Sequence, residues 1–195
     1  MGKKIMIVNG SPHDGGNTMT LVGWVADAAR EAGADVEIVD AARLDCKVPG
    51  CIACMGCHAS EEFRCVVDDE AGEVIARIPS QDAVVLATPV YFMGFSAQIK
   101  RVIDRMFSLF KFDDEKGTSY APGLRETTFA LIATAGGGED DGLDLVLKNT
   151  EAIAGFVSEG VRSLLVPFAH SERGVVDTNR ELRERAGAFG RELAA

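Results

Sequence analysis

Four of the chain's five cysteines lie in one short segment, CIACMGCHASEEFRC, at residues 51–65. Cys51, Cys54 and Cys57 follow one another at every third position, and Cys65 comes after a gap of seven residues. Gaps of two residues let successive thiolates converge on one metal centre, and bacterial ferredoxins begin with the same C-x2-C-x2-C spacing. The spacing therefore favours an iron–sulfur cluster.

Other interpretations of these cysteines remain open. A zinc site usually takes two separated C-x2-C pairs, whereas here the two pairs share Cys54, and His58 competes with its neighbour Cys57 for the same geometry. The thiols could also be free or form an oxidised pair. Cys46 lies five residues before Cys51 and is interpreted as a bystander.

Composition limits the class of protein. The chain has 195 residues, of which 47% are apolar, and its net charge is −10. We expect a single domain spanning residues 1–195. The negative charge argues against nucleic acid or an anionic membrane surface as the main partner. The apolar run near the start is too short for a signal peptide or a membrane span, so we expect a cytoplasmic protein, where clustered cysteines are more often metal or redox groups than structural disulfides.

Strand and helix patterns alternate along the chain. Apolar runs predict strands at 3–9, 35–40, 82–88, 127–134 and 161–168, and helical periodicity predicts helices at 17–32, 69–78, 96–110, 141–158 and 178–193. Strict alternation implies an α/β fold with a five-stranded parallel sheet and helices on both faces. The cysteines fall in an insertion at about 46–68, and the polar segment 111–123 is predicted to be a loop.

Such sheets bind ligands at the carboxyl ends of their strands. The loop after the first strand, NGSPHDGGNT (9–18), offers glycines, the donors Ser11, Asn17 and Thr18, and a helix N-terminus, but no lysine or arginine. These groups make a neutral cradle for a phosphate. The alternative is a polar turn with Asn17 as the helix cap.

Two further loops leave the same edge of the sheet. TPVYFMGFSAQIK (88–100) places large apolar residues where a flat ligand could lie, although such residues could also pack in the core or against another subunit. ATAGGGED (133–140) has three consecutive glycines, which permit a close approach of the backbone to a ligand or make a flexible connector. His13, His58 and His170 are too scattered to suggest a catalytic group.

At this point the residues resemble a known family. GSPHDGGNT and TPVYFMGFSAQIKRVIDR resemble the two signatures of the NAD(P)H-dependent FMN reductases of flavodoxin-like fold, and the cysteine segment resembles that of their iron–sulfur flavoprotein branch. The resemblance covers about the first 140 residues. It implies the flavodoxin-like strand order 2-1-3-4-5 and an FMN-binding domain.

The resemblance also implies which residues bind FMN. The phosphate would lie against Ser11, His13, Asn17 and Thr18, although an arginine is usual at the position of His13. The residues along the isoalloxazine ring would be Pro89, Val90, Tyr91, Phe92, Met93 and Gly94. Thr134, Ala135, Gly136 and Gly137 would approach its pyrimidine side. No catalytic acid or nucleophile is needed from the protein, because the redox chemistry belongs to the cofactor.

The iron–sulfur branch further implies that Cys51, Cys54, Cys57 and Cys65 ligate a 4Fe–4S cluster close to the flavin of a neighbouring subunit. The function implied is the passage of electrons from NAD(P)H through FMN, and through the cluster, to a quinone, flavin or protein acceptor. The alternatives are a non-enzymatic, flavodoxin-like electron carrier and a zinc-stabilised binding module without flavin. We expect a homodimer or homotetramer, since the family builds its flavin site at a subunit interface and the helix at 96–110 carries a long apolar stripe.

Overall fold

The computed structural model describes residues 2–113, 115, 117–157, 160–170 and 176–195. Its parallel sheet has the order β2-β1-β3-β7-β8, in which the short strand β4 (Gly94–Phe95) pairs antiparallel with the end of β3. The five parallel strands are β1 (Lys4–Asn9), β2 (Asp35–Asp40), β3 (Ala83–Tyr91), β7 (Thr128–Thr134) and β8 (Arg162–Val166). Counted by themselves, these strands have the predicted order 2-1-3-4-5, so the predicted fold class is confirmed.

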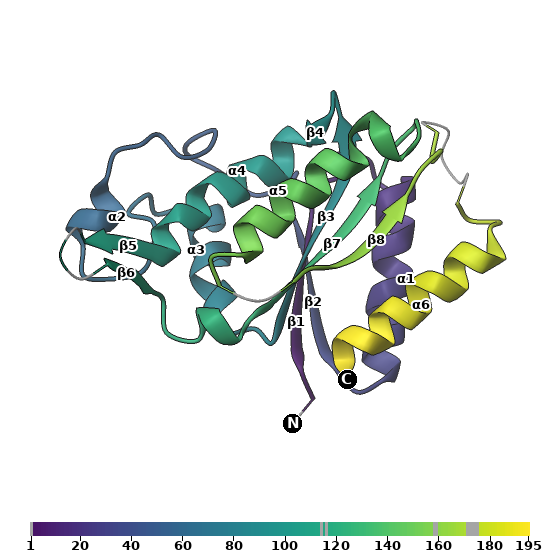
Figure 1. Ribbon diagram of the computed structural model, residues 1–195, viewed down its shortest axis with the longest axis horizontal. Coiled ribbons are helices and arrows are strands. Elements are labelled where there is room, and N and C mark those ends of the chain that lie inside the picture. Colours follow the sequence, from purple (N-terminus) through teal and green to yellow (C-terminus); the bar gives the residue numbers. More distant parts are fainter. Residues whose placement is uncertain (1, 114, 116, 158–159, 171–175) are drawn as a thin grey trace.

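Helices cover both faces of the sheet (Figure 1). One face packs against α1 (Asn17–Glu31) and α6 (Arg180–Ala194), and the other against α3 (Glu70–Arg77), α4 (Ala97–Arg105) and α5 (Asp144–Ala154). Each face has its own hydrophobic core. Within β1, Ile5 and Ile7 belong to the core under α1 and α6, whereas Met6 and Val8 belong to the core under α3, α4 and α5. Because both faces of the central strands β1, β3 and β7 are buried, these strands read as apolar runs rather than as alternating patterns.

Side chains define where several helices begin. Asp69 accepts a hydrogen bond from Gly72 N–H at the start of α3, Ser96 accepts one from Ile99 N–H at the start of α4, and Asn179 does the same for Leu182 N–H at α6. Such caps satisfy donors that have no partner inside the helix. The start of α1 differs, because it follows Gly16 and no side chain caps it.

The segment after α4 corrects two predictions. The predicted helix at 96–110 ends as α4 at Arg105 and continues as the 3-10 helix η2 (Met106–Leu109). The predicted loop at 111–123 holds an antiparallel hairpin of β5 (Phe110–Asp113) and β6 (Gly117–Tyr120). The tighter turn keeps Met106 and Leu109 in the core, and Phe110 then packs its ring edge-on against Tyr120 across the hairpin at 5.6 Å. Tertiary packing therefore ends the α-helix at Arg105, although the apolar periodicity continues to Phe110.

The remaining elements are short. They are the helix α2 (Gly56–Ala59), the 3-10 turns η1 (Ile78–Ser80) and η3 (Leu124–Glu126), and a π-helical turn η4 (Glu139–Leu143) that precedes α5. The predicted helix at 141–158 therefore begins irregularly and ends at Ala154, and residue 158 lies outside the described residues. The cysteine segment, α2 and the β5–β6 hairpin extend together from one end of the molecule (Figure 1). None of the described helices is both long and apolar enough to cross a membrane.

Candidate functional site

A cavity of about 330 Å³ opens where β1, β3 and β7 end. We name it the strand-end cavity, and it brings the three predicted loops together. Its lining residues are Ser11, His13, Gly16, Asn17, Thr18, Pro89, Val90, Tyr91, Thr134, Gly136, Ala169 and His170. Most of the residues predicted from the sequence to bind FMN thus share one cavity. None of these lining residues is a lysine or an arginine.

The N-terminus of α1 forms the polar wall of this cavity. No described side chain caps the helix, and its first turn contains no acidic residue. The backbone N–H groups of a first turn have no partner inside the helix and stand at the positive end of its dipole. Ser11 N–H donates to Asn9 Oδ1 at 3.1 Å, and His13 N–H donates to Ser11 Oγ at 3.3 Å, so the loop before the helix is internally braced. This arrangement fits a phosphate group.

Buried hydrogen bonds hold the loops of the strand-end cavity together. The hydroxyls of Thr18 and Thr134 lie 2.8 Å apart and link α1 to β7. Ser96 Oγ donates to the Gly10 carbonyl at 2.6 Å and so links the loop after β3 to the loop after β1. Bonds between segments far apart in the sequence fix the shape of the cavity before any ligand enters.

The other predicted FMN residues do not line the strand-end cavity. Phe92 and Met93 form an exposed turn with left-handed backbone angles, φ of 45° and 67°, and the Phe92 side chain is fully exposed. Gly94 follows them in β4, Ala135 is buried, and the Gly137 carbonyl accepts a hydrogen bond from Phe168 N–H at 2.9 Å. The structure places these five residues around the cavity rather than in its wall.

Sequence reasoning missed several residues at this edge of the sheet. Ala169 and His170 follow β8 and line the strand-end cavity, and the Asn17 amide donates to the His170 carbonyl at 2.8 Å. The rule that ligands lie at strand ends also applied to β8 and could have found both. Gly142, with φ of 107°, packs against Val90 and Met93, where a Cβ atom would lie 2.7 Å from Val90 Cγ1.

A second cavity, of about 350 Å³, lies at the end of the molecule formed by the cysteine segment. We name it the cysteine cavity. All four candidate ligands line it, together with apolar side chains such as Ile52 and Val66, and Cys46 does not. Cys51 and Cys54 are exposed, whereas Cys57 and Cys65 are half-buried. In the part of the chain that the structure describes, no three potential ligand side chains are close enough for a single metal ion.

The backbone between the cysteines has an unusual shape. Ala53 and Met55, on either side of Cys54, have φ of 54° and 55°, in the left-handed region that non-glycine residues rarely adopt. Each such residue costs on the order of 1–3 kcal/mol. Left-handed residues next to right-handed ones turn successive N–H groups into one concave surface that binds anions, including iron–sulfur clusters. Met55 is followed directly by the right-handed turn of α2.

The thiols of the cysteine cavity are close enough to affect one another. Burial raises the pKa of Cys57, and the negative charges of Cys65, Cys51 and Cys54 raise it further, in that order. Four thiolates in one cavity therefore repel one another unless positive charge is bound among them. A multi-iron cluster would meet this requirement, because its iron ions supply positive charge and are bound by four cysteine thiolates. The donor set fits such a cluster better than it fits one ion.

A buried ion pair anchors the cysteine cavity to α4. The side chains of Arg105 and Asp69 are each 1% exposed, and they join through two bonds, Nη2–Oδ1 at 2.8 Å and Nη1–Oδ2 at 2.9 Å. Burial acts to raise the pKa of Asp69, but the hydrogen bonds from Arg105, Gly72 N–H and Lys47 N–H outweigh it and hold that pKa below its usual value. Burial acts to lower the pKa of Arg105. Hydrogen bonds to Asp69 and then to Cys65, together with the negative charges of both groups, outweigh burial and hold that pKa above its usual value.

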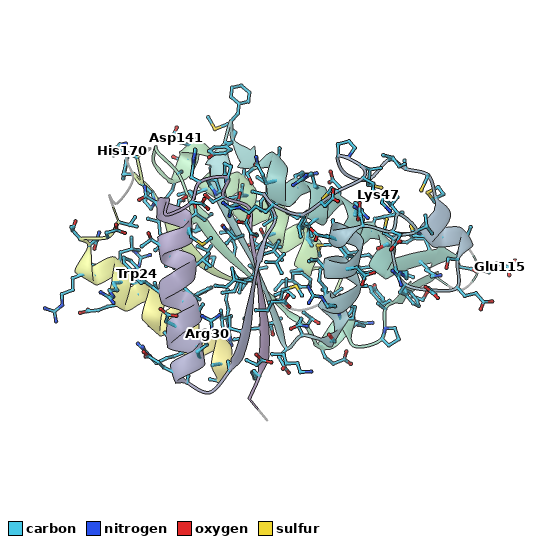
Figure 2. All side chains as sticks on the ribbon, turned by 180° about the vertical axis from the view of Figure 1, so that it is seen from behind. Trp24, Arg30, Lys47, Glu115, Asp141 and His170 are labelled. Atoms are coloured by element: carbon cyan, nitrogen blue, oxygen red, sulfur yellow. The ribbon has the colours of Figure 1, made fainter. Side chains whose placement is uncertain are left out.

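His58 packs as an aromatic ring. It stacks on Phe107 at 4.7 Å and on Phe112 at 5.7 Å between ring centres, which joins α2 to η2 and to β5. His58 does not line the cysteine cavity. Figure 2 shows His170, which lines the strand-end cavity, near one end of the molecule, and Lys47 and Glu115 toward the opposite end.

Comparisons with known proteins agree with this geometry. The family of NADPH-dependent FMN reductases matches residues 3–162. An iron–sulfur flavoprotein of Methanocaldococcus jannaschii is 34% identical over 137 residues, which is 66% of this chain and 69% of that protein. An iron–sulfur flavoprotein of Methanosarcina thermophila is 32% identical over 102 residues, which is 52% of this chain and 51% of that protein, so the match spans only about half of it.

Solved structures share the fold. An NAD(P)H:quinone oxidoreductase from Methanothermobacter marburgensis superposes with a TM-score of 0.76 at 16% identity, covering 100% of this chain and 98% of that one. An FMN-dependent NADH-azoreductase from Bacillus anthracis, in complex with FMN, has a TM-score of 0.74 at 14% identity, covering 99% and 100%. Since the family match extends over most of the sequence, the chain belongs to the NADPH-dependent FMN reductase family and is an FMN-dependent oxidoreductase that uses NAD(P)H.

Proposed function

We propose that this protein passes electrons from NAD(P)H, by way of FMN in the strand-end cavity and a 4Fe–4S cluster in the cysteine cavity, to a quinone, a flavin or a redox protein. NAD(P)H gives up a hydride, which carries two electrons and one proton. A quinone acceptor takes two electrons and two protons, the second proton coming from solvent. The observation that carries the proposal is that all four cysteines of the motif line one cavity, with left-handed backbone at Ala53 and Met55 between them.

In the strand-end cavity the chain would bind and orient the cofactor. The first-turn N–H groups of α1 and the hydroxyls of Ser11 and Thr18 would hold the phosphate, with His13 beside them. Pro89, Val90 and Tyr91 would lie along the ring, and Thr134 and Gly136 would approach its other side. FMN, when bound, supplies the conversion between a two-electron donor and one-electron acceptors. The residues that ring the cavity, Phe92, Met93, Gly94, Ala135 and Gly137, would shape its entrance.

In the cysteine cavity Cys51, Cys54, Cys57 and Cys65 would hold the cluster, which supplies single-electron transfer. The left-handed residues Ala53 and Met55 would point backbone N–H groups at the sulfurs. The strain they store would be offset by those bonds. The names of the archaeal relatives support this part of the proposal, since both are iron–sulfur flavoproteins.

We further propose that the cluster serves the flavin of a second copy of the chain. Within one chain the two cavities lie near opposite ends of α4, whose nine residues span about 12 Å at the usual rise. Large apolar side chains are exposed beside both cavities, namely Tyr91, Phe92 and Met93 at one and Ile52, Met55 and Val66 at the other. Exposed apolar groups gathered in this way favour contact with another subunit. A homodimer or homotetramer would bring the two kinds of cavity together.

Family membership favours this proposal over its alternatives. A zinc-stabilised module without flavin does not agree with a match to FMN reductases over residues 3–162. A purely passive electron carrier would not need NAD(P)H. Turnover of NAD(P)H with a quinone, with free flavin and with no acceptor separates an enzyme from a carrier, and the acceptor that gives the largest kcat/KM identifies the substrate class.

The experiment for the cluster compares two cysteine variants. Protein purified without oxygen is assayed for FMN, iron and acid-labile sulfide, and its absorption spectrum is recorded. We expect about four irons per chain in the wild type and in the matched control Cys46→Ser, whose thiol lies outside the cysteine cavity. Cys54→Ser should lose the iron and keep the FMN. Iron that is absent from the wild type, or unchanged in Cys54→Ser, would contradict the assignment.

A further inference from the structure

Two buried polar groups in the wall of the cysteine cavity have no hydrogen-bond partner among the residues that the structure describes. They are Arg105 Nε and Ser108 Oγ, and both residues are 2% exposed. Leaving a buried donor without a partner is unfavourable, because the hydrogen bond that it made to water is lost and not replaced. Such groups are few in folded proteins, and each one calls for an explanation.

The rest of the Arg105 side chain shows how it is aimed. Its two terminal nitrogens are taken up by Asp69 and by the Val67 carbonyl, which accepts from Nη2 at 3.0 Å. These three bonds fix the plane of the guanidinium, and Nε is the nitrogen that has no partner among the described residues. Ser108 lies three residues further along the chain, in the 3-10 turn η2, where side chains at i and i+3 lie on the same side. Both donors therefore belong to one wall.

The opposite walls of the cavity offer sulfur as the acceptor. They consist of the four cysteines and of apolar side chains, among them Ile52, Met55 and Val66. Asp104, the one carboxylate among the described lining residues, pairs with Lys100 instead. Cys65 is close enough to Arg105 for its thiolate to interact with the guanidinium. A neutral, empty cavity would leave both donors unsatisfied, whereas thiolate and sulfide are anionic acceptors for them.

We propose that Arg105 Nε and Ser108 Oγ donate hydrogen bonds to sulfur atoms of the cluster, Cys65 Sγ among them, and thereby raise its reduction potential. This inference rests on the cluster in the proposed function. Each electron added makes the cluster more negative, so a fixed donor or cation stabilises the reduced form more than the oxidised form. Hydrogen bonds to the sulfurs are one of the means by which a protein sets the potential of such a cluster.

The test measures the midpoint potential of the cluster in holoprotein purified without oxygen, by a redox titration followed with electron paramagnetic resonance. Ser108→Ala removes one donor with little change of shape, and Arg105→Lys keeps the charge but cannot reproduce three donating nitrogens. The matched controls are Ser119→Ala, an exposed hydroxyl on β6, and Arg101→Lys, an arginine of α4 that bonds the Ala41 carbonyl outside the cavity.

At an ambient potential fixed near the wild-type midpoint, we expect the ratio of oxidised to reduced cluster to be about threefold higher in Ser108→Ala than in the wild type. In Arg105→Lys the shift should be about tenfold, which is 59 mV for a one-electron couple. Both midpoints should move to lower potential, and the two controls should match the wild type. Should Arg105→Lys fail to fold or to keep iron, Ser108→Ala decides the matter by itself.

The outcomes separate the inference from the proposed function. Iron at about four per chain with an unchanged midpoint in Ser108→Ala and Arg105→Lys overturns the inference and leaves the cluster in place. A wild-type protein without iron overturns the cluster and, with it, the inference. An upward shift of the midpoint also overturns the inference, because removing a donor can only disfavour the more negative state.

Discussion

The strand-end cavity and the cysteine cavity lie toward opposite ends of α4 and are built from different kinds of structure. The first is formed by loops that leave neighbouring strands of one sheet, so strand register fixes where its residues stand. The second is formed by a long connection between β2 and α3, with only the four-residue helix α2 inside it. Regular structure positions one cavity, and individual side-chain contacts position the other.

Their electrostatics differ in the same way. The strand-end cavity offers neutral donors and a helix terminus, with no lysine or arginine among the described residues that line it. The cysteine cavity depends on one buried charge, Arg105, which is held by Asp69. A site made of backbone N–H groups has no buried ion whose hydration is lost. In contrast, removing one partner of a buried ion pair lowers the free energy of unfolding by about 3–5 kcal/mol. We therefore expect the two cavities to fail under different substitutions.

The largest effect should come from Asp69→Asn, which leaves the Arg105 charge buried without its partner. The free energy of unfolding should fall by about 3–5 kcal/mol. Glu184→Gln, which breaks the exposed pair with Arg180, should cost less than about 1 kcal/mol. Denaturant titrations of both variants measure the difference. Equal, small losses would mean that the ion pair does not anchor the cysteine cavity.

Gly142→Ala should damage the strand-end cavity instead. A Cβ at this position would lie 2.7 Å from Val90 Cγ1 and 2.8 Å from Met93 Cα, and φ is 107°. We expect a loss of about 2 kcal/mol in stability and about tenfold weaker FMN binding, with the iron content unchanged. The matched control is Gly23→Ala in α1, where the space is open and alanine should stabilise the helix by about 1 kcal/mol. Flavin titration and iron assays read out the two cavities separately.

Ser11→Ala should have a smaller and more local effect. It removes a hydroxyl that accepts from His13 N–H and faces the strand-end cavity. A lost hydrogen bond of about 1 kcal/mol corresponds to roughly fivefold weaker FMN binding. Cys54→Ser should leave FMN affinity unchanged. Fluorescence titration with FMN compares both variants with the wild type. Equal FMN affinities in the wild type, Ser11→Ala and Cys54→Ser would show that Ser11 is not part of the binding site.

The smallest effect is seen only in acid. Because the folded-state pKa of Asp69 is lowered, this carboxylate stabilises the protein fully above its unfolded pKa of about 3.9. That stability is lost as the pH falls through the lower folded value. The free energy of unfolding measured from pH 7 to pH 3 should therefore decline more steeply in the wild type than in Asp69→Asn. Parallel curves would show that another carboxylate controls acid stability.

Much of the strand-end cavity could be read from the sequence. Apolar runs such as the one at β1 fixed the strands, and parallel strands bring their carboxyl ends to one edge, so the loops at 9–18, 88–100 and 133–140 had to meet. Ala169 and His170 could not be found from those three loops, because they follow the fifth strand. Phe92, Met93 and Gly94 lie outside the lining of the cavity, and a sequence does not show which side of a turn faces inward.

The cysteine cavity was predictable only in its chemistry. The spacing favoured an iron–sulfur cluster, and the resemblance to the iron–sulfur flavoproteins implied Cys51, Cys54, Cys57 and Cys65 as its ligands, with Cys46 interpreted as a bystander. The partner of Asp69 was not visible, since it lies 36 residues away on another helix. The hairpin at 110–120 was also hidden, because the apolar stripe of α4 continues into it.

The sequence by itself determined the five parallel strands with the helices between them, the three loops at one edge and the cysteine motif, since these follow from local periodicity and spacing. Only the tertiary structure decided that Arg105 and Ser108 stand buried in the wall of the cysteine cavity, and that Gly142 supports the turn after β3. The physical reason is that burial and pairing are properties of contacts between distant segments, which neither composition nor periodicity contains.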